Sequence, residues 1–527
     1  MIRWHHLPFL FATGVAVIGG CTSSRRSFGP PPPDGGDTSS FGEAPEGDPC
    51  EAAAKSKSYI GCDAWPTPVA NVAWSVFDFA VVVANAGTRP ANIKVERAGA
   101  QVSTATVEPN GLTKIYLPWV PELKGKDSDY CGSVLSALPA SVHAAGGAYH
   151  LKSDRPVTVY QFNALEYAPV GGPAKKDWTA CPGDLGCPGV SCLSYSNDAS
   201  LLFPTNALTG TYRITGVASA NGNSYFAVTA TADGTKVKVQ LSSTAKVLAG
   251  GGLAATDAKG TLEFSMNAGD VVEVAAQSGN DSDLSGSLVI ADHPVQVIAG
   301  HPCLNVPQGI MACDHLEQSV LPAETLGKHY FVEQPTGPYG AVPGHVVRIY
   351  GNVDGTKLTY PQDAPKNAPA TIDAGQVVDL GIVEQDFEIV GDQAFAVITL
   401  MLGGNAVDPD TNEGDPSMSS LVAVEQYRTK YVFLAPDDYD TSYVDAVHPM
   451  TTTLTLDGAP IETAATAIGT SGFGVHRIRL DDKSSRGAHV IESSEPFGLQ
   501  VLGYGKSTSY QYPAGLDLEH IAPPPLK

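Results

Sequence analysis

The sequence is poor in basic residues. Its 32 lysines and arginines stand against 55 aspartates and glutamates, and its pI is near 4.8. Nucleic acids and anionic lipid surfaces are bound through clusters of positive charge. The composition therefore argues against nucleic acid as a partner. Acidity alone indicates no particular ligand, because it also keeps an exported protein soluble.

Catalytic signature motifs are also missing. Neither His-Glu-x-x-His nor Gly-x-Ser-x-Gly occurs in the sequence. Gly505-Lys506-Ser507 matches the end of a phosphate-binding loop, but Gln500 stands where that motif requires glycine. Residues 243–246 have Ser-x-x-Lys spacing without the companion motifs of acyl-serine enzymes. We therefore predict no catalytic residues, no enzyme activity and no cofactor.

Long apolar runs are limited to the N-terminus. Residues 7–18 are apolar and follow Arg3, but the run is shorter than the about 20 residues that a membrane-spanning helix needs. It ends in Ile18-Gly19-Gly20-Cys21, which resembles a bacterial lipobox. We predict a lipoprotein signal peptide over residues 1–20 and lipidation of Cys21. The alternative is an ordinary signal peptide with an incidental cysteine.

Residues 21–49 contain almost nothing that a core could bury. They are rich in serine, proline, glycine and acidic residues, which predicts a flexible tether behind the lipid. Thr22 follows the lipidated cysteine where an aspartate would favour the inner membrane of enterobacteria. We therefore expect a protein of the cell envelope that is lipid-anchored to the outer membrane and exposed at the surface.

Helical periodicity is missing from the remaining chain. Residues 77–83, 225–231 and 236–241 alternate or run apolar with many β-branched side chains, and glycine, asparagine or aspartate bounds each of them. The predicted fold class is all-β.

Three patterns recur at a spacing of about a hundred residues. The first is a turn followed by an apolar strand, at residues 153–159, 291–297, 391–397 and 494–500. The second ends in a tyrosine, at Tyr212, Tyr330 and Tyr431. The third is an Asp-Gly turn between two strands, at residues 233–234 and 354–355, which predicts hairpins.

The repeats predict four β units. The boundaries are 50–197 (with a cysteine-rich insert), 198–313, 314–414 and 415–520, followed by a tail at 521–527. Each unit has enough short strands for a two-sheet sandwich, and equally for a pair of propeller blades. We favour tandem sandwich-like repeats, with propeller-like blades as the alternative.

Eight cysteines remain besides Cys21, an even number that predicts disulfides in an exported protein. They are Cys50, Cys62, Cys131, Cys181, Cys187, Cys192, Cys303 and Cys313. Only short-range pairs can be proposed from sequence, namely Cys303 with Cys313 and Cys50 with Cys62. His301 and His315 beside the first pair leave a zinc site as the alternative. A separate acidic loop carries weak calcium-ligand candidates at Asp408, Asp410 and Asn412.

The segment around Cys303 has the most specific pattern in the chain. It reads Gly-His-x-Cys-x-x-Val-Pro, a short loop, then Cys-Asp-His-x-Glu-Gln and a proline; the residues are Gly300, His301, Cys303, Val306, Pro307, Cys313, Asp314, His315, Glu317, Gln318 and Pro322. This pattern resembles the N-terminal domain of the IgG-Fc-binding protein family. The likeness extends over about residues 77–510. It implies a binding module without catalytic residues, and the absence of von Willebrand D-type cysteine-rich domains argues against retained antibody binding.

These observations favour a non-catalytic binding or adhesion module at the cell surface, whose partner is an extracellular protein or glycan. Two alternatives belong to other classes. One is a structural envelope protein that associates with itself, and the other is a carbohydrate-active enzyme, which would need two carboxylates facing one cleft.

Overall fold

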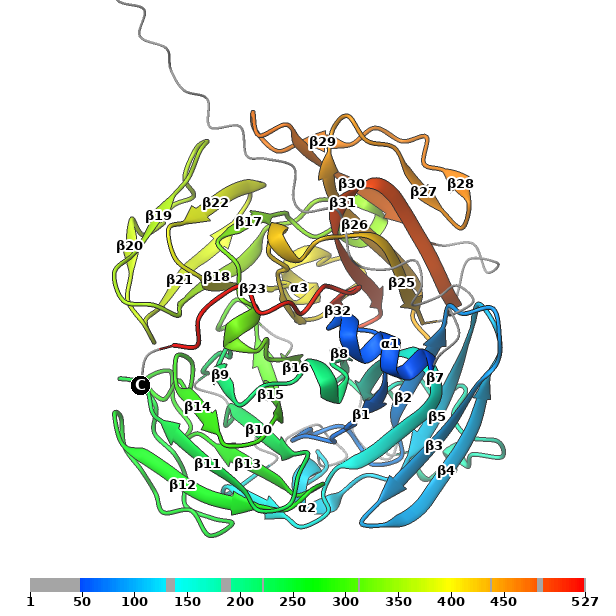
Figure 1. Ribbon diagram of the computed structural model, residues 1–527, viewed down its shortest axis with the longest axis vertical. Coiled ribbons are helices and arrows are strands. Elements are labelled where there is room, and N and C mark those ends of the chain that lie inside the picture. Colours follow the sequence, from blue (N-terminus) through cyan, green and yellow to red (C-terminus); the bar gives the residue numbers. More distant parts are fainter. Residues whose placement is uncertain are drawn as a thin grey trace, which may run out of the picture. The chain divides into compact units, whose positions relative to one another are not determined.

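The computed structural model describes residues 48–128, 138–181, 191–219, 222–310, 313–436, 438–480 and 487–525 (Figure 1). Strands dominate these residues, and the α-helices among them are short: α1 Pro49–Ser56, α2 Pro121–Lys124 and α3 Gly404–Val407. The all-β prediction is confirmed. No helix in these ranges is long and apolar enough to cross a membrane. The predicted signal peptide, Cys21 and most of the predicted tether lie outside the described residues.

The strands form four units, and each unit has two sheets. Unit 1 contains β1 Gly61–Ala64, β2 Phe79–Asn85, β3 Ala91–Arg97, β4 Ala100–Val107, β5 Gly111–Leu117, β7 Tyr149–Asn163 and β8 Asp198–Leu202. Unit 2 contains β6 Val142–Ala144, β9 Thr211–Arg213, β10 Tyr225–Ala230, β11 Thr235–Gln240, β12 Thr261–Met266, β13 Val271–Ala275, β14 Leu288–Ala291, β15 Val295–Asn305 and β16 Cys313–Ser319.

Units 3 and 4 are formed by the strands that follow along the chain. Unit 3 contains β17 His329–Val332, β18 His345–Gly351, β19 Thr356–Thr359, β20 Thr371–Ile372, β21 Val377–Val383, β22 Phe387–Gly391, β23 Phe395–Leu400 and β24 Met418–Ser420. Unit 4 contains β25 Arg428–Ala435, β26 Thr441–Pro449, β27 Leu454–Leu456, β28 Ala459–Pro460, β29 Thr466–Ala467, β30 Phe473–Arg479, β31 Gly487–Gly505 and β32 Thr508–Pro513.

All four units share one strand order. The first sheets run β4-β3-β7-β1, β12-β11-β14-β9, β20-β19-β22-β17 and β28-β27-β31-β25. The second sheets contain β5-β2-β7-β8, β13-β10-β15-β16, β21-β18-β23-β24 and β30-β26-β31-β32. The repeated turn-and-strand pattern of the sequence marks the point where the chain passes from the first sheet to the second. In units 1 and 4 one long strand, β7 or β31, belongs to both sheets and makes this passage. In units 2 and 3 the corresponding stretch consists of two strands, which are separated by a turn at residues 292–294 or 392–394.

The repeated tyrosines explain the second sequence pattern. Each follows a short 3-10 turn, and its hydroxyl group joins two backbone positions. The Tyr330 hydroxyl accepts a hydrogen bond from Gly327 N at 3.2 Å and donates one to the Phe395 carbonyl at 2.6 Å. Tyr212 makes the same pair of bonds with Thr209 N and the Val295 carbonyl. The tyrosine therefore fastens the start of a unit to the strand that follows the passage between its sheets.

The hairpins predicted at the Asp-Gly turns are wrong. β10 and β11 flank Asp233-Gly234 but lie in different sheets, and β18 and β19 around Asp354-Gly355 do likewise. β10 is buried on both faces, whereas β11 alternates between buried and exposed side chains. A strand that is buried on both faces and a strand that is buried on one face belong to different sheets here. The turn therefore takes the chain from one sheet of the sandwich to the other. Asp233 holds this turn by accepting a hydrogen bond from Ala268 N at 3.0 Å.

The last strands of the units, β8, β16, β24 and β32, are called the terminal strands here. Contacts join β8 with β16 and β32, and β24 with β16 and β32. One hydrophobic cluster spans residues of all four units around them, in addition to the cores of units 1, 2 and 3. The units are therefore sandwiches in a propeller-like arrangement, which combines both alternatives that the sequence left open (Figure 1).

Each terminal strand pairs with the second sheet of the unit that it ends. The predicted boundary at residue 198 precedes β8, the one at 314 falls in β16, and the one at 415 precedes β24. Hydrogen bonding therefore places each unit's end one strand later along the chain than these boundaries do.

The two ends of the described chain meet beside α1. Tyr59 N donates to the Leu516 carbonyl at 3.2 Å, and Leu518 N donates to the Lys57 carbonyl at 2.7 Å. A disulfide between Cys50 and Cys62 joins α1 to β1. These hydrogen bonds connect unit 1 to unit 4, although the two units lie at opposite ends of the chain.

We expect Tyr330→Phe to lower the free energy of unfolding by about 1–3 kcal/mol, because it leaves a buried amide and a buried carbonyl without their partner. Chemical denaturation monitored by tryptophan fluorescence measures this change. Tyr339→Phe is the matched control, since that side chain is 70% exposed. Equal stability of the two variants would show that the tyrosine fastening is unimportant.

Candidate functional site

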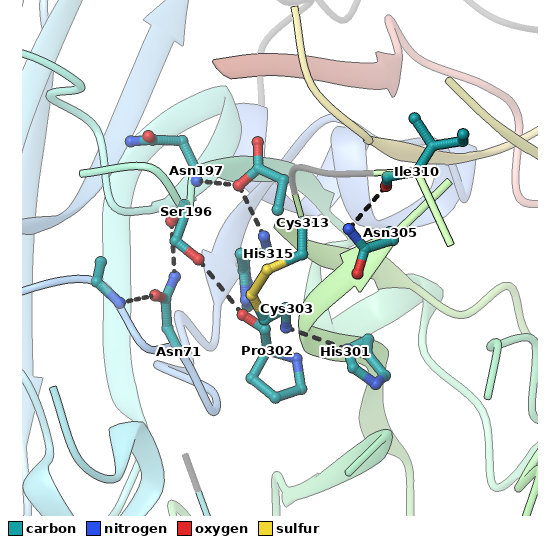
Figure 2. Close-up of a disulfide and its surroundings, with 12 residues drawn as sticks. Asn71, Ser196, Asn197, His301, Pro302, Cys303, Asn305, Ile310, Cys313 and His315 are labelled. Carbon is teal, nitrogen blue, oxygen red and sulfur yellow. Dashed lines mark hydrogen bonds between the residues drawn. A yellow bond between two sulfur atoms is a disulfide. The ribbon is translucent and has the colours of Figure 1, made fainter. Parts of the chain in front are cut away.

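Except for Pro322, which precedes the 3-10 turn Ala323–Thr325, the residues of the Cys303 pattern lie on β15, on β16 and in the loop between them (Figure 2). The structure forms the Cys303–Cys313 disulfide across this loop, with the two Cα atoms 5.0 Å apart. Gly300 lies on β15, and a Cβ atom there would collide with the Leu316 carbonyl oxygen of β16. Glycine is therefore required at this position by the contact between the strands.

Hydrogen bonds hold the loop in place on both sides. Within it, Asn305 Nδ2 donates to the Ile310 carbonyl at 2.8 Å (Figure 2). Gln308 Nε2 donates to the Ala218 carbonyl of unit 2 at 3.1 Å, and Gly403 N of unit 3 donates to the Val306 carbonyl at 2.7 Å. The loop therefore bridges two units.

The histidines of the pattern are neutral groups of the core. His301 Nδ1 accepts a hydrogen bond from Cys303 N at 3.1 Å, and the His315 ring stacks against Tyr225. Burial lowers the pKa of both His301 and His315 to about 3. The two cysteine sulfurs are bonded to each other and are not available as thiolate ligands. Among the described residues, no group of three or more histidine, cysteine or acidic side chains is arranged to hold a metal ion.

The acidic residues of the pattern take part in contacts between units. Asp314 accepts hydrogen bonds from Asn197 N and His315 N, both at 2.7 Å. Glu317 accepts from Asn163 and from Gln161 of β7 in unit 1. Burial raises the pKa of Asp314 and Glu317 well above the ordinary carboxyl range.

Two further buried acids, which the sequence analysis missed, complete this centre. Asp198 of β8 accepts from Glu317 N at 3.1 Å and from the Ser417 hydroxyl at 2.7 Å, so it joins units 1, 2 and 3. Asp415 lies just before β24, and burial raises its pKa to about 8. Its negative charge also helps to raise the pKa of Asp314. The available signal was the number of polar residues in segments of strand-like pattern, such as Asp198 and Ser200 in β8 and Ser419 and Ser420 in β24.

The remaining candidates are distributed elsewhere. Cys181 pairs with Cys192 in the cysteine-rich insert, and Cys131 and Cys187 lie outside the described residues. Of the calcium candidates, Asp408 accepts from the Thr411 hydroxyl, and Asn412 Nδ2 donates to the Ser507 hydroxyl at 2.7 Å. Asp410 is exposed. Asp408 therefore stabilises its own loop, and Asn412 stabilises the contact of that loop with the β31–β32 turn.

The pattern is thus a buried joint between units and not an exposed binding surface. His301, Asp314, His315, Glu317 and Gln318 are all fully buried. Large apolar side chains at the surface include Ile310, Tyr339 and Val342, which lie between strands, and Ile382 of β21.

Comparison with known proteins agrees with the pattern. A family model described as IgGFc binding protein matches residues 198–503. The human IgGFc-binding protein is 27% identical over 304 residues, which are 55% of this chain and 5% of that protein. The chain therefore spans a small part of this curated relative.

The solved structures that match this chain include two of low sequence identity. Both are anti-sigma factor domain-containing proteins, one of them from Clostridium clariflavum. Each is 11% identical with a TM-score of 0.11, over 58% or 60% of this chain and 81% or 83% of the other. Similarity at that level indicates neither a shared fold nor a shared function.

We expect Asp415 to contribute stability that is lost as the pH rises from about 4 to about 8. Its pKa is raised in the folded state, so the folded protein keeps a proton that the unfolded chain has lost over this interval. One such group contributes a slope of at most about 1.4 kcal/mol per pH unit. Asp415→Asn should flatten the pH dependence of the free energy of unfolding, whereas Asp410→Asn should leave it unchanged. Parallel curves for wild type and Asp415→Asn would contradict this assignment.

Proposed function

Because the chain belongs to the IgGFc-binding protein family, we propose that it is a non-catalytic binding module that recognises an extracellular macromolecule through its surface loops. The observation that carries this proposal is the burial of the family pattern. Its polar side chains join unit 2 to units 1 and 3, so relatives can share the scaffold while their exposed loops differ.

Repetition of the units also supports a binding role. Four sandwiches with the same strand order present equivalent sets of loops on one rigid body. Several weak contacts on one body can raise the overall affinity by 10²-fold or more, provided that the partner reaches them together. A large protein or glycan partner fits this arrangement better than a small molecule does.

We further propose that the protein is a lipoprotein displayed from the outer membrane. The basis is the sequence Ile18-Gly19-Gly20-Cys21 after an apolar run, followed by residues rich in proline, glycine and serine. A tether of this composition would let the loops reach partners away from the membrane.

The anchor is tested by Cys21→Ala. The substitution removes the thiol that would be acylated, so we expect the protein to leave the membrane fraction and appear in the soluble fraction. Immunoblotting of membranes after a high-salt wash measures the distribution. Cys50→Ala serves as the control, because it also removes a cysteine but leaves the lipobox intact. A Cys21→Ala protein that still sediments with washed membranes would refute the lipid anchor.

The binding function is tested with the purified full-length chain, immobilised and exposed to envelope fractions, glycan arrays and extracellular proteins that include IgG Fc. We expect saturable binding to a macromolecule and no turnover in parallel hydrolase assays. We expect no binding to IgG Fc, because the chain corresponds to 5% of the human relative and is 27% identical over the matched residues.

An unrelated protein of similar size and negative charge controls for non-specific electrostatic binding. Turnover that a single carboxylate substitution abolishes would replace the binding function with an enzyme. Binding to the chain itself and to nothing else would indicate a structural, self-associating protein.

A further inference from the structure

A cleft of about 200 Å³ lies between units 2 and 3, next to the Cys303–Cys313 disulfide. One wall comes from residues 304–308 of the disulfide loop. The other comes from the second sheet of unit 3. Apolar side chains line both walls, among them Leu304, Val306, Val346, Ile382 and Leu400.

The unit 3 wall is a row across three neighbouring strands. Val346 of β18 is paired with Ile382 of β21 on one side and with Leu400 of β23 on the other. Directly paired residues point to the same face of a sheet, so the three side chains form one apolar strip. Leu400 is buried at 1% exposure, but Ile382 is 48% exposed at the edge strand. The strip therefore runs from the core to the surface and leaves apolar area uncovered.

The opposite wall is held rigidly. The Val306 carbonyl accepts a hydrogen bond from Gly403 N of unit 3, and the Gln308 side chain is bonded to the Ala218 carbonyl. The disulfide closes the base of the loop. A wall that is already ordered costs little conformational entropy when a ligand binds.

The edge of the cleft carries more negative than positive charge. Arg348 of β18 pairs with Asp283 at 2.6 Å and with Asp379 at 3.5 Å, so one guanidinium group faces two carboxylates. Residues 302–327 and 367–427, which supply the wall of the disulfide loop and strands β21 and β23, contain several acidic residues and neither lysine nor arginine. Asp379 lines the cleft and is exposed. Gly344, beside Ile382, also lies close to the Glu384 side chain. The edge of the cleft therefore favours a partner that brings positive charge.

The size of the cleft narrows the choice of occupant. Sites for small molecules usually measure about 300–1,000 Å³, so a cleft of 200 Å³ suits a single side chain better than a whole ligand. We propose that this cleft receives one apolar side chain of a partner protein segment whose neighbouring residues are lysine or arginine. This inference rests on the proposed binding function and specifies where and how a protein partner docks.

The test uses the full-length chain and a fluorescein-labelled peptide, Gly-Lys-Lys-Leu-Lys-Lys-Gly, followed by fluorescence polarisation at low and physiological salt. One comparison peptide replaces leucine with serine, and another replaces all lysines with glutamate. We expect the first peptide to bind more tightly than both others and to lose affinity as salt rises.

Ile382→Ser removes the exposed end of the apolar strip without changing the charge. We expect it to weaken binding of the leucine peptide by about five- to tenfold, which corresponds to the loss of part of one buried aliphatic contact. Val102→Ser is the matched control, because Val102 is 40% exposed on β4 of unit 1. Circular dichroism and thermal unfolding confirm that both variants are folded.

Equal binding of the leucine and serine peptides, or no effect of Ile382→Ser, would overturn the cleft as a docking site. The same variant in the macromolecular binding assay separates the two proposals. Binding of a partner that survives Ile382→Ser would refute the cleft and leave the binding function standing. Loss of partner binding in Ile382→Ser but not in Val102→Ser would support both.

Discussion

The structure depends on the burial of polar groups where the four terminal strands meet. Asp198 of unit 1 accepts hydrogen bonds from Glu317 N of unit 2 and from Ser417 before β24 of unit 3. A buried polar group without its partner costs about 1–3 kcal/mol, and more if it is charged. Separating one unit from the others would leave several such groups unsatisfied at once. The four sandwiches are therefore one cooperative body and not independent domains on a string, and the contacts of Tyr59 and Lys57 with the C-terminal segment close it.

This arrangement divides the chain into a constrained interior and a freer surface. The family pattern belongs to the interior, where Gly300 avoids a collision with β16 and His301 and His315 stay neutral. The disulfide loop belongs to both, because its ends join the buried strands while Gln308 and Ile310 reach the surface. A rigid interior gives the exposed loops and the adjacent cleft a fixed geometry, which is what a binding module requires.

Much of the strand content was predictable from residue pattern. The alternation in Lys236–Leu241 and the apolar run in Phe77–Val83 gave strands close to β11 and β2, because burial on one or both faces leaves a period of two or a continuous run. The repeated tyrosines predicted the repeat. Their role, which is to join two backbone segments through hydrogen bonds of the hydroxyl group, is visible only in the tertiary structure. The Asp233-Gly234 turn was misread, because such a turn is locally compatible with a hairpin and with a crossing between sheets. Only the partners of β10 and β11 decide between the two.

By itself the sequence determined the all-β class, the fourfold repetition and the specific pattern around Cys303, because these follow from local periodicity, spacing and composition. It proposed the Cys303–Cys313 and Cys50–Cys62 pairs from their short spacing and left zinc as the alternative for the first pair, and the structure forms both disulfides. The tertiary structure alone decided that the units are sandwiches arranged around their terminal strands and that Asp198, Asp314 and Asp415 meet there. It also decided that Val346, Ile382 and Leu400 form one strip opposite the disulfide loop. These residues lie far apart along the chain, and pairing between strands of different segments depends on the packing of all the sheets together. Local pattern contains no information about which distant strand becomes a neighbour.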